Sequence, residues 1–403
     1  MRALTLAPED EDARRVVADL WWARFRQAEA GSSPAEIAMA LSRVERFDDG
    51  RYMRLLEGGG RLSLQGPERA TVRLHRFEPR ARRLHAELRH EAPLPLDRMP
   101  LEPGSWLAEV RLEGCTSARI HLAVRRQQHT RLEVRLFTPA QVGEGFVHVP
   151  GGPFHMGGDP IARMVGWRVG GRGPLRGFVA GGDPLARGAL ESCEPTLSDR
   201  FVLETPVTSE AWRVFLDDLE PDEARALVPG DTGLHGRVLP YWEHDGQGWV
   251  LPEDWDPHWP VMGVSMRDAQ AYARWLSERT GRALRLLTEE EWEKAARGAD
   301  GRPFPWGHGF DPGFAHMRQS APGAPRPGPV GSYPVDTSVY GLRDMAGCIR
   351  EWTSSIYDEG QVVVRGGSWH DDEDDLRVAS RSGLDPNLRS PFVGFRLVSE
   401  DPA

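Results

Sequence analysis

Cysteine is scarce in this chain, and long apolar runs are missing. Its 403 residues include three cysteines, Cys115, Cys193 and Cys348, which are too few and too scattered for a disulfide framework or a Cys-x-x-Cys metal site. No apolar run approaches the roughly 18 residues that a membrane-spanning helix requires, and the N-terminal residues turn acidic before the apolar core of a signal peptide could develop. We therefore expect a cytoplasmic protein with isolated thiols and no membrane partner.

Lysine is almost absent, so arginine carries nearly all of the positive charge: Lys294 is the one lysine among 50 basic residues. The net charge of −10 is unevenly distributed. Residues 51–140 carry 17 arginines against 10 acidic residues, whereas residues 141–403 carry 26 basic against 40 acidic residues. This contrast predicts separate domains. Aromatic residues are not interleaved with the arginines of the basic segment, which argues against nucleic acid as a partner.

The first 58 residues predict a short helical domain. Apolar residues recur at spacings of three and four in residues 12–30 and 34–47, as on the buried face of an amphipathic helix. Pro34 follows two serines and suits the first turn of the second helix. Two short helices cannot bury an apolar stripe by themselves, and the lead-in LTLAPEDEDAR resembles the closing proline of a tetratricopeptide unit. We interpret residues 1–58 as the end of a helical array.

Residues 59–140 predict a small β-sandwich. Apolar and polar residues alternate there as they do in half-buried strands, and the pairs Gly66-Pro67 and Pro103-Gly104 mark loops. The proline-glycine turn that leads into an alternating strand resembles the PEGA type of β-sandwich. The runs that carry the alternation are residues 61–66, 70–77, 106–114, 118–126 and 131–137.

Two helices are predicted within the remaining residues, 141–403. Ser265 is a suitable N-cap, Asp268 lies three residues further on as in a capping box, and Gly281 ends the helix. Thr288 and a glutamate three residues later repeat the capping pattern for a second helix that extends to residue 297.

A glycine-rich segment precedes these helices. The sequence GGDPIAR at residues 157–163 recurs as GGDPLAR at residues 181–187, which we interpret as a local duplication that lengthened a loop. A phosphate-binding loop would need a strand before the glycines and a helix after them. The sequence indicates neither, so we do not expect a nucleotide.

Several blocks of the third region occur in an order that points to a family. They are FVHVPGGPFHMGGD (146–159), ETPVTSEAWRVFLDDL (204–219), residues 260–298, FPWG (304–307), YGLRDMAGCIREWT (340–353) and residues 363–397. In this order they resemble the formylglycine-generating-enzyme (sulfatase-modifying factor) family, and several ordered blocks are more specific than one short motif. The resemblance implies an α+β protein whose residues 141–403 form a C-type-lectin-like domain rich in coil.

The order of helical segment, β-sandwich and family domain resembles the region downstream of the kinase domain in bacterial serine/threonine kinases that are fused to a formylglycine-generating-enzyme domain. The chain itself has no glycine-rich loop followed by a kinase-type lysine, no HRD and no DFG motif. The resemblance therefore implies a relative or a portion of such a protein, with a kinase or another signalling or defence protein as a partner.

The family enzymes hold copper(I) with a pair of cysteines just after the turn that reads GGSW here. Alignment on that turn places Asp371 and Leu376 at the two cysteine positions. Copper(I) selects thiolates, whereas a carboxylate is a hard ligand and leucine is no ligand. The resemblance therefore implies no copper and no catalytic residue at this corner. We interpret the chain as a non-catalytic recognition module that binds a peptide or protein.

An enzyme is the alternative interpretation. A branch of the family, the iron-dependent sulfoxide synthases, binds iron through an HxxxHxE set, and the nearest pattern here is His85, His90 and Glu91. Five residues along a strand place the two imidazole rings on opposite faces, which does not favour non-haem iron. A metal-dependent oxidoreductase, with iron or copper, that acts on a peptide or thiol substrate stays open.

The resemblance also implies a structural calcium ion in the stretch YGLRDMAGCIREW. The positions carried over are Asp344, Gly347, Ile349 and Glu351, which offer carboxylate and backbone oxygens for a hard cation. Cys348 stands where the family usually has asparagine, so an ordinary hydrogen-bonded loop is the alternative.

An acidic run follows the GGSW turn, and it is the predicted partner-binding surface. In the resembled fold this loop lies beside a groove that takes an arginine-containing peptide, and a run of like charges is destabilising unless a cation neutralises it. We expect a partner with basic residues to bind here, with a solvated loop as the alternative. Arg381 and Arg396, further along, are expected to hold loops through carboxylates. The predicted groove comprises Trp369, His370, Asp371, Asp372, Glu373, Asp374 and Asp375.

Overall fold

The chain divides into two compact units. The first comprises residues 1–136 with 299–302, and the second comprises residues 137–298 with 303–403. The segment interpreted as a helical domain lies in the first unit, and so does the segment interpreted as a β-sandwich except for its last four residues, 137–140. In the described part of the chain, no helix has the length and apolar character to cross a bilayer. The computed structural model describes residues 10–30, 34–56, 58–159, 161–162, 189–232 and 237–403, so the second copy of the GGDP repeat lies outside the described residues.

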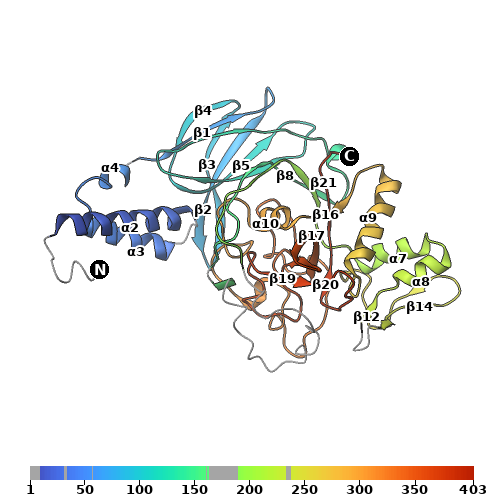
Figure 1. Cartoon of the computed structure of the whole chain (residues 1–403). Coiled ribbons are helices and arrows are strands. Elements are labelled where there is room, and N and C mark those ends of the chain that lie inside the picture. Colours follow the sequence, from blue (N-terminus) through green and yellow to red (C-terminus); the bar gives the residue numbers. More distant parts are fainter. Residues whose placement is uncertain (1–9, 31–33, 57, 160, 163–188, 233–236) are drawn as a thin grey trace. The chain divides into compact units, whose positions relative to one another are not determined.

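The two predicted N-terminal helices are confirmed. Helix α2 (Glu11–Ala30) and helix α3 (Pro34–Phe47) lie side by side in Figure 1. Each turns the apolar stripe defined by its three-and-four spacing toward the other. A short helix, α4 (Met53–Leu56), follows. The buried residues that the helices share are Val17, Trp21, Phe25, Ala40 and Val44.

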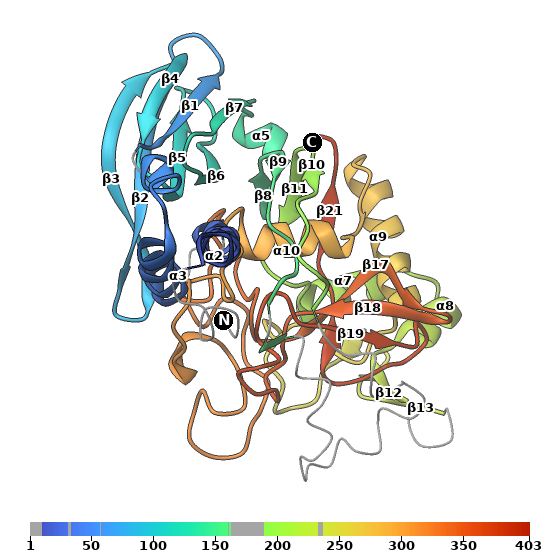
Figure 2. The same ribbon diagram turned by 60° about the vertical axis from the view of Figure 1, so that its left-hand side comes forward.

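The rest of the first unit is a pair of β-sheets. One sheet has the strand order β4-β1-β7 and the other has the order β3-β2-β5-β6, and the long strands β2 and β3 are prominent in Figure 2. Leu62 and Leu64 of one sheet share an apolar core with Val72 and Leu74 of the other. Each of the predicted runs contains a strand, whereas β3 and β4 were missed because charged residues and prolines interrupt their alternation. The strands are β1 (Gly60–Gln65), β2 (Thr71–Arg80), β3 (Arg83–Pro93), β4 (Leu96–Leu101), β5 (Gly104–Arg111), β6 (Ala118–Val124) and β7 (His129–Glu133).

The four-residue segment Ala299–Arg302 completes the first unit. The buried Asp300 carboxylate accepts a hydrogen bond from Ser105 Oγ at 2.7 Å and pairs with Arg302 at 2.7 Å. His121 Nδ1 accepts a hydrogen bond from the first N–H of the segment, so the ring proton lies on Nε2. Burial lowers the pKa of His121. Burial would raise the pKa of Asp300, but the Arg302 charge outweighs it and holds that pKa well below its usual range.

Short strands and long connections dominate the second unit. One four-stranded sheet has the order β16-β21-β11-β8, a second has the order β19-β18-β17-β20, and three ribbons have two strands each. At the entry of the domain, β8 is followed by the two-residue strand β9, which lies on the Gly-Gly-Pro stretch. The strands are β8 (Phe146–Val149), β9 (Gly152–Pro153), β10 (Thr196–Leu197), β11 (Arg200–Leu203), β12 (Gly230–Thr232), β13 (Val238–Pro240), β14 (Glu243–His244), β15 (Trp249–Val250), β16 (Arg285–Leu286), β17 (Arg350–Asp358), β18 (Gln361–Arg365), β19 (Arg381–Leu384), β20 (Val393–Gly394) and β21 (Leu397–Ser399).

Both predicted helices of the second unit are confirmed, with their caps. The Ser265 hydroxyl and Asp268 form a capping box at the start of α9, and Gly281 ends that helix in the left-handed conformation with φ 69°. Thr288 and Glu291 form the box of α10. The helices are α5 (Pro139–Val142), α7 (Ser209–Asp217), α8 (Pro221–Leu227), α9 (Met266–Thr280) and α10 (Glu289–Arg297), with a 3-10 turn at Pro312–Phe314.

Aromatic side chains from helices and strands build the core of the second unit. Trp212 of α7 stacks on Tyr272 of α9 with ring centroids 5.5 Å apart, and Phe395 packs edge-on against both rings. Helices packed on short antiparallel and mixed strands define an α+β fold, as predicted. The likenesses to C-type lectins and to PEGA sandwiches stay predictions.

Candidate functional site

Asp371 holds the turn that follows β18. Its Oδ2 accepts hydrogen bonds from the Ser368 N–H and hydroxyl, both at 2.7 Å, and from Arg350 Nε at 2.7 Å. The residue is 6 % exposed. Burial by itself would raise the pKa of this carboxyl group, but the Arg350 charge outweighs burial and holds the pKa below its usual value. Asp371 is therefore a charged and hydrogen-bonded side chain inside the protein.

Arg350 of β17 is the positively charged partner of Asp371, and we call the region around these two residues the corner. Besides Asp371, its guanidinium contacts Asp375 at 3.3 Å and the Ser382 hydroxyl at 3.3 Å. Burial would lower the pKa of the guanidinium, but the charges of the two aspartates outweigh it and raise that pKa. A permanent positive charge thus lies where the resemblance places the copper-binding pair.

Leu376 fills the second of the two aligned cysteine positions. It is completely buried in an apolar cluster with Phe304, Trp306, Met317 and others. The Phe304 and Trp306 rings are stacked, with centroids 5.0 Å apart and planes within 2°. The corner therefore consists of an ion pair on one side and apolar core on the other, neither of which is a ligand for copper(I).

All three cysteines are free thiols, as predicted. Cys348 comes near the corner, because its carbonyl accepts a hydrogen bond from the Trp369 N–H at 2.9 Å. Its thiol is buried, and burial raises its pKa well above the usual value, so the reactive thiolate is disfavoured. Cys348 has φ 76°, a conformation that asparagine tolerates better than other non-glycine residues.

The acidic run, predicted to be a partner-binding surface with a solvated loop as the alternative, is only partly exposed. Asp371 is buried and Asp375 is half-buried, and both face Arg350. Asp372 and Glu373 are exposed, and Asp372 accepts a hydrogen bond from the Gln319 amide at 2.5 Å. Asp372 also lies 3.5 Å from Arg318, so cations of the protein itself face both buried and exposed carboxylates of the run. We call Asp372, Glu373 and the half-buried Asp374 the acidic rim.

Three aromatic rings lie beside the acidic rim. Trp369, His370 and Phe392 are half-buried and pack on one another with centroids 5.1 to 5.5 Å apart. Arg318 donates a hydrogen bond from Nε to the His370 carbonyl at 2.9 Å. Burial, followed by the Arg318 charge, lowers the pKa of His370. The predicted groove residues Trp369 and His370 thus share one surface with the rim, whereas Trp352 is buried in the core.

Two of the predicted calcium positions, Asp344 and Glu351, contact Arg396. Both oxygens of Glu351 accept hydrogen bonds from Arg396 at 2.7 to 2.9 Å, and Trp292 Nε1 donates to Oε2 at 3.0 Å. Arg396 also donates to the carbonyls of Arg343 and Asp344. The Glu351 carboxylate is therefore already hydrogen-bonded to Arg396 and Trp292. Its pairing with Arg396, like that of Arg381 with Glu289 at 2.9 Å, confirms that these arginines hold loops through carboxylates.

Asp344 lies beside Asp336, an acid that the sequence did not single out. Asp336 accepts hydrogen bonds from the Ala346 and Gly347 N–H groups, and Asp344 accepts one from the Gly331 N–H at 2.6 Å. Burial, followed by the charge of Asp344, raises the pKa of Asp336 to about 7, and burial raises that of Asp344 to about 6. Two adjacent buried carboxyl groups suit a hard cation in chemistry. The calcium site stays a prediction, with Asp344 as its available carboxylate.

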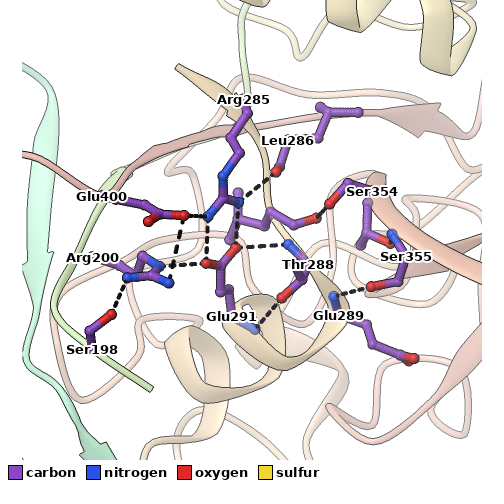
Figure 3. A network of polar contacts seen from close by, with 12 residues as sticks. Ser198, Arg200, Arg285, Leu286, Thr288, Glu289, Glu291, Ser354, Ser355 and Glu400 are labelled. Atoms are coloured by element: carbon purple, nitrogen blue, oxygen red, sulfur yellow. Dashed lines mark hydrogen bonds and ion pairs between the residues drawn. The ribbon is translucent and has the colours of Figure 1, made fainter. Parts of the chain in front are cut away.

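Helix α10 anchors the same unit through further arginine–carboxylate pairs. Figure 3 shows the guanidinium groups of Arg200 and Arg285 both pointing at the Glu291 carboxylate, with Glu400 closing the network from the other side. The Arg285 contacts to Glu291 are 2.7 and 2.8 Å. Two residues further along the helix, the buried Glu293 pairs with two more arginines. The strands around the corner are thereby fixed by charge-assisted hydrogen bonds.

The residues considered for iron do not form a site. His85 is half-buried on β3, and His90 is exposed and stacks on Trp106 with centroids 6.2 Å apart. Within the described ranges, no group of three histidine, cysteine, aspartate or glutamate side chains is placed to hold a metal ion. An HxxxHxE-type iron centre therefore does not fit the arrangement of His85, His90 and Glu91.

The second unit matches a known family along nearly its whole length. Residues 134–401 match the model described as "Sulfatase-modifying factor enzyme 1-like domain". The match covers more than half of the chain, and the chain therefore belongs to this formylglycine-generating-enzyme family. The family expected from the ordered sequence blocks is confirmed.

One of the relatives is named as an inactive protein, and others are named as enzymes. An "Inactive C-alpha-formylglycine-generating enzyme 2" of Bos taurus is 34 % identical over 282 residues, 63 % of this chain and 87 % of that protein. A "Hercynine oxygenase" of Mycolicibacterium smegmatis is 34 % identical over 236 residues, 48 % of this chain and 51 % of that protein. The "Serine/threonine-protein kinase Pkn1" of Chlamydia trachomatis is 34 % identical over 254 residues, 55 % of this chain and 38 % of that protein. Family membership alone thus does not decide whether this chain is a catalyst.

Proposed function

We propose that this chain is a non-catalytic member of its family, a recognition module that binds a peptide or protein with basic residues through the acidic rim and the adjacent rings of Trp369 and His370. The proposal rests on the side chains that occupy the two aligned cysteine positions. Asp371 is buried in an ion pair with Arg350, and Leu376 is buried in apolar core. A relative of this sequence is named inactive, which supports the same reading.

The loss of copper chemistry follows from the ligands. Copper(I) binding needs soft thiolate ligands, and a cation placed next to Arg350 would also meet its positive charge at close range. The thiol of Cys348 is held in its neutral form by burial. These arguments favour binding without turnover.

The acidic rim supports a basic partner. Asp372 and Glu373 are exposed and carry negative charge next to half-buried aromatic rings. Exposed charges at the edge of an interface mainly accelerate association, and salt screens them. Proteins of kinase signalling or of defence are the partners we consider, in keeping with the relative named as a kinase.

The test compares two charge-neutralised variants that are matched in chemistry. D372N/E373Q removes two carboxylates from the rim, and D222N/E223Q removes an adjacent, exposed aspartate and glutamate from α8. We expect the rim variant to bind basic peptides severalfold more slowly than wild type at low ionic strength, with the difference vanishing near molar salt. The α8 variant should associate at the wild-type rate. If both variants associated with the peptides at the same rate, the acidic rim would not be the binding surface.

Enzyme activity is tested on the same preparation. Purified protein that has been exposed to copper(I) and iron(II) should retain neither metal in stoichiometric amount, and cysteine-containing peptides should be recovered unoxidised. Stoichiometric metal together with peptide or thiol oxidation would establish the metal-dependent oxidoreductase instead.

A further inference from the structure

A pocket of about 510 Å³ lies in the first unit, where the chain passes from α4 into β1. Two glycines of this connection, residues 58–59, line it together with residues 100–103, which lead from β4 to β5. The charged side chains in its wall are Arg76, Glu102 and Arg126. Pockets of this size hold small organic molecules or short peptide segments, and a few polar groups fix the orientation of the ligand.

The walls of the pocket are held by the backbone. A Cβ atom on Gly59 would clash with the Leu101 carbonyl oxygen, so only glycine allows the two connections to approach so closely. The Gly59 carbonyl accepts a hydrogen bond from the Gln127 N–H at 3.0 Å. Trp106 Nε1 donates a hydrogen bond to the Glu102 carbonyl at 2.9 Å. The pocket is therefore preformed, and little conformational entropy is lost when a ligand enters it.

Arg126, between β6 and β7, presents an oriented guanidinium group to the pocket. Its Nε donates to the Glu29 carboxylate at 2.8 Å, and its Nη1 donates to the carbonyls of Leu56 and Gly58. Among the residues that the structure describes, Nη2 of Arg126 has no hydrogen-bond partner. The side chain is 27 % exposed. A fixed cation with an unused N–H₂ group is thus available to an anion.

Arg76 of β2 is already paired with a carboxylate that a ligand can replace. Its Nη1 donates to the Glu102 carboxylate, its Nη2 donates to the Pro103 carbonyl at 3.5 Å, and its Nε lies 3.5 Å from Glu78. The Glu102 side chain is 72 % exposed, and ion pairs with so exposed a partner contribute little to stability. Glu102 therefore occupies Arg76 as a weak internal competitor for an incoming anion.

We propose that this pocket binds an acidic peptide segment, with one oxyanion paired to Arg126 and another in the place of Glu102 on Arg76. Carboxylate and phosphate groups share the geometry that the planar guanidinium fork recognises. The surroundings favour the same ligand, because residues 51–140 carry 17 arginines against 10 acidic residues and attract anions over a longer range. The pocket is independent of the acidic rim, whose proposed partner has the opposite charge.

The test measures peptide binding to the full chain by isothermal titration calorimetry at low ionic strength. Gly-Asp-Gly-Asp-Gly should bind in a saturable way, whereas the same peptide with asparagine in place of aspartate should not bind. The peptide with phosphoserine at the same positions distinguishes the source of the oxyanion, since the tighter of the two acidic peptides contains the preferred group. Inorganic phosphate should bind more weakly than either. If inorganic phosphate bound as tightly as the peptides, the ligand would not be a peptide.

E102Q gives the sharpest result, because removal of the internal competitor should strengthen binding of the aspartate peptide about two- to fivefold. E113Q removes the same charge from an exposed site between β5 and β6 and should leave the affinity close to that of wild type. Both variants change exposed side chains, so the comparison does not depend on a buried substitution.

Two arginine variants complete the test. R76Q should weaken binding severalfold, and R126K, which retains a positive charge for Glu29 but loses the Nη2 group, should also weaken it. R111Q, an exposed arginine of β5 outside the pocket, should not. Equal affinities in E102Q and E113Q, or equal binding of the aspartate and asparagine peptides, would overturn the proposal.

Discussion

Arginine–carboxylate pairs occur in both units, but their surroundings differ. On the β2–β3 hairpin of the first unit, Glu87 pairs with Arg80 and Arg89, whose side chains are 71 % and 43 % exposed. In the second unit, Glu293 and its partner Arg365 are at most 1 % exposed. Exposed pairs contribute about 0–1 kcal/mol, whereas removing one partner of a buried pair costs about 3–5 kcal/mol because the other charge stays buried and unpaired. The same chemical pair is therefore dispensable on the exposed hairpin and essential where both side chains are buried.

The largest effect is expected from E293Q. Glu293 accepts hydrogen bonds from Arg297 at 2.5 Å, from Arg365 and from the Gly157 N–H at 2.7 Å. Glutamine keeps the shape but carries no charge and places an N–H₂ group opposite these donors. We expect a loss of about 3–5 kcal/mol in the free energy of unfolding, measured by urea denaturation. A loss below about 1 kcal/mol would mean that the buried and exposed pairs are energetically alike.

The corner gives the next test. D371N removes the charge that faces Arg350 but leaves Asp375 at 3.3 Å from the same guanidinium. The expected loss is therefore smaller than for E293Q, about 2–3 kcal/mol in the free energy of unfolding. D375N, with Asp371 retained, should cost less again. If D375N were the more damaging of the two, the assignment of Asp371 as the main partner of Arg350 would be wrong.

The Arg350–Asp371 pair also shows which contacts can be predicted from the sequence and which cannot. Capping residues such as Ser265 and Thr288 act within one turn of chain, so their spacing alone predicted α9 and α10 correctly. The pairing of Arg350 with Asp371 joins a strand to a loop 21 residues later, and no local pattern encodes which arginine meets which acid. The acidic run was therefore interpreted as a row of like charges that a basic partner neutralises, whereas contacts within the protein neutralise part of it. The order of the family blocks predicted the fold. The absence of the cysteine pair predicted that the loop after the GGSW turn differs from that of the family enzymes.

Lys294, the single lysine of the chain, is a buried charge with no carboxylate in hydrogen-bond contact among the residues that the structure describes. It donates to the Gly152 carbonyl at 2.9 Å, and burial lowers its pKa to about 8. Between pH 8 and 10.5 the unfolded chain keeps a proton on this lysine that the folded chain has lost, so the wild-type protein gains stability as pH rises through that window. K294M has no such group. We expect the stability difference to move in favour of wild type by about 1–3 kcal/mol between pH 7.5 and 10, at about 1.4 kcal/mol per pKa unit. A pH-independent difference would show that Lys294 titrates normally.

Calcium should give a smaller effect. If calcium binds through Asp344 and nearby carbonyl oxygens, it stabilises the folded state by mass action, by about 1.4 kcal/mol at ten times the dissociation constant. The melting temperature of metal-free protein should then rise on addition of calcium and return with chelator, and D344N should abolish the response. An unchanged melting curve would leave Arg396 as the cation that organises this loop.

The smallest effect is expected from E87Q, the exposed counterpart of E293Q. Glu87 faces Arg80 at 2.8 Å and Arg89 at 3.1 Å, distances as good as those of many buried pairs. Water and salt replace these contacts when the charge is removed, since all three side chains are at least one-third exposed. We expect a change of about 0.5 kcal/mol or less in the free energy of unfolding, disappearing in molar salt. A loss comparable to that of E293Q would show that geometry, rather than burial, decides what an arginine–carboxylate pair contributes in this protein.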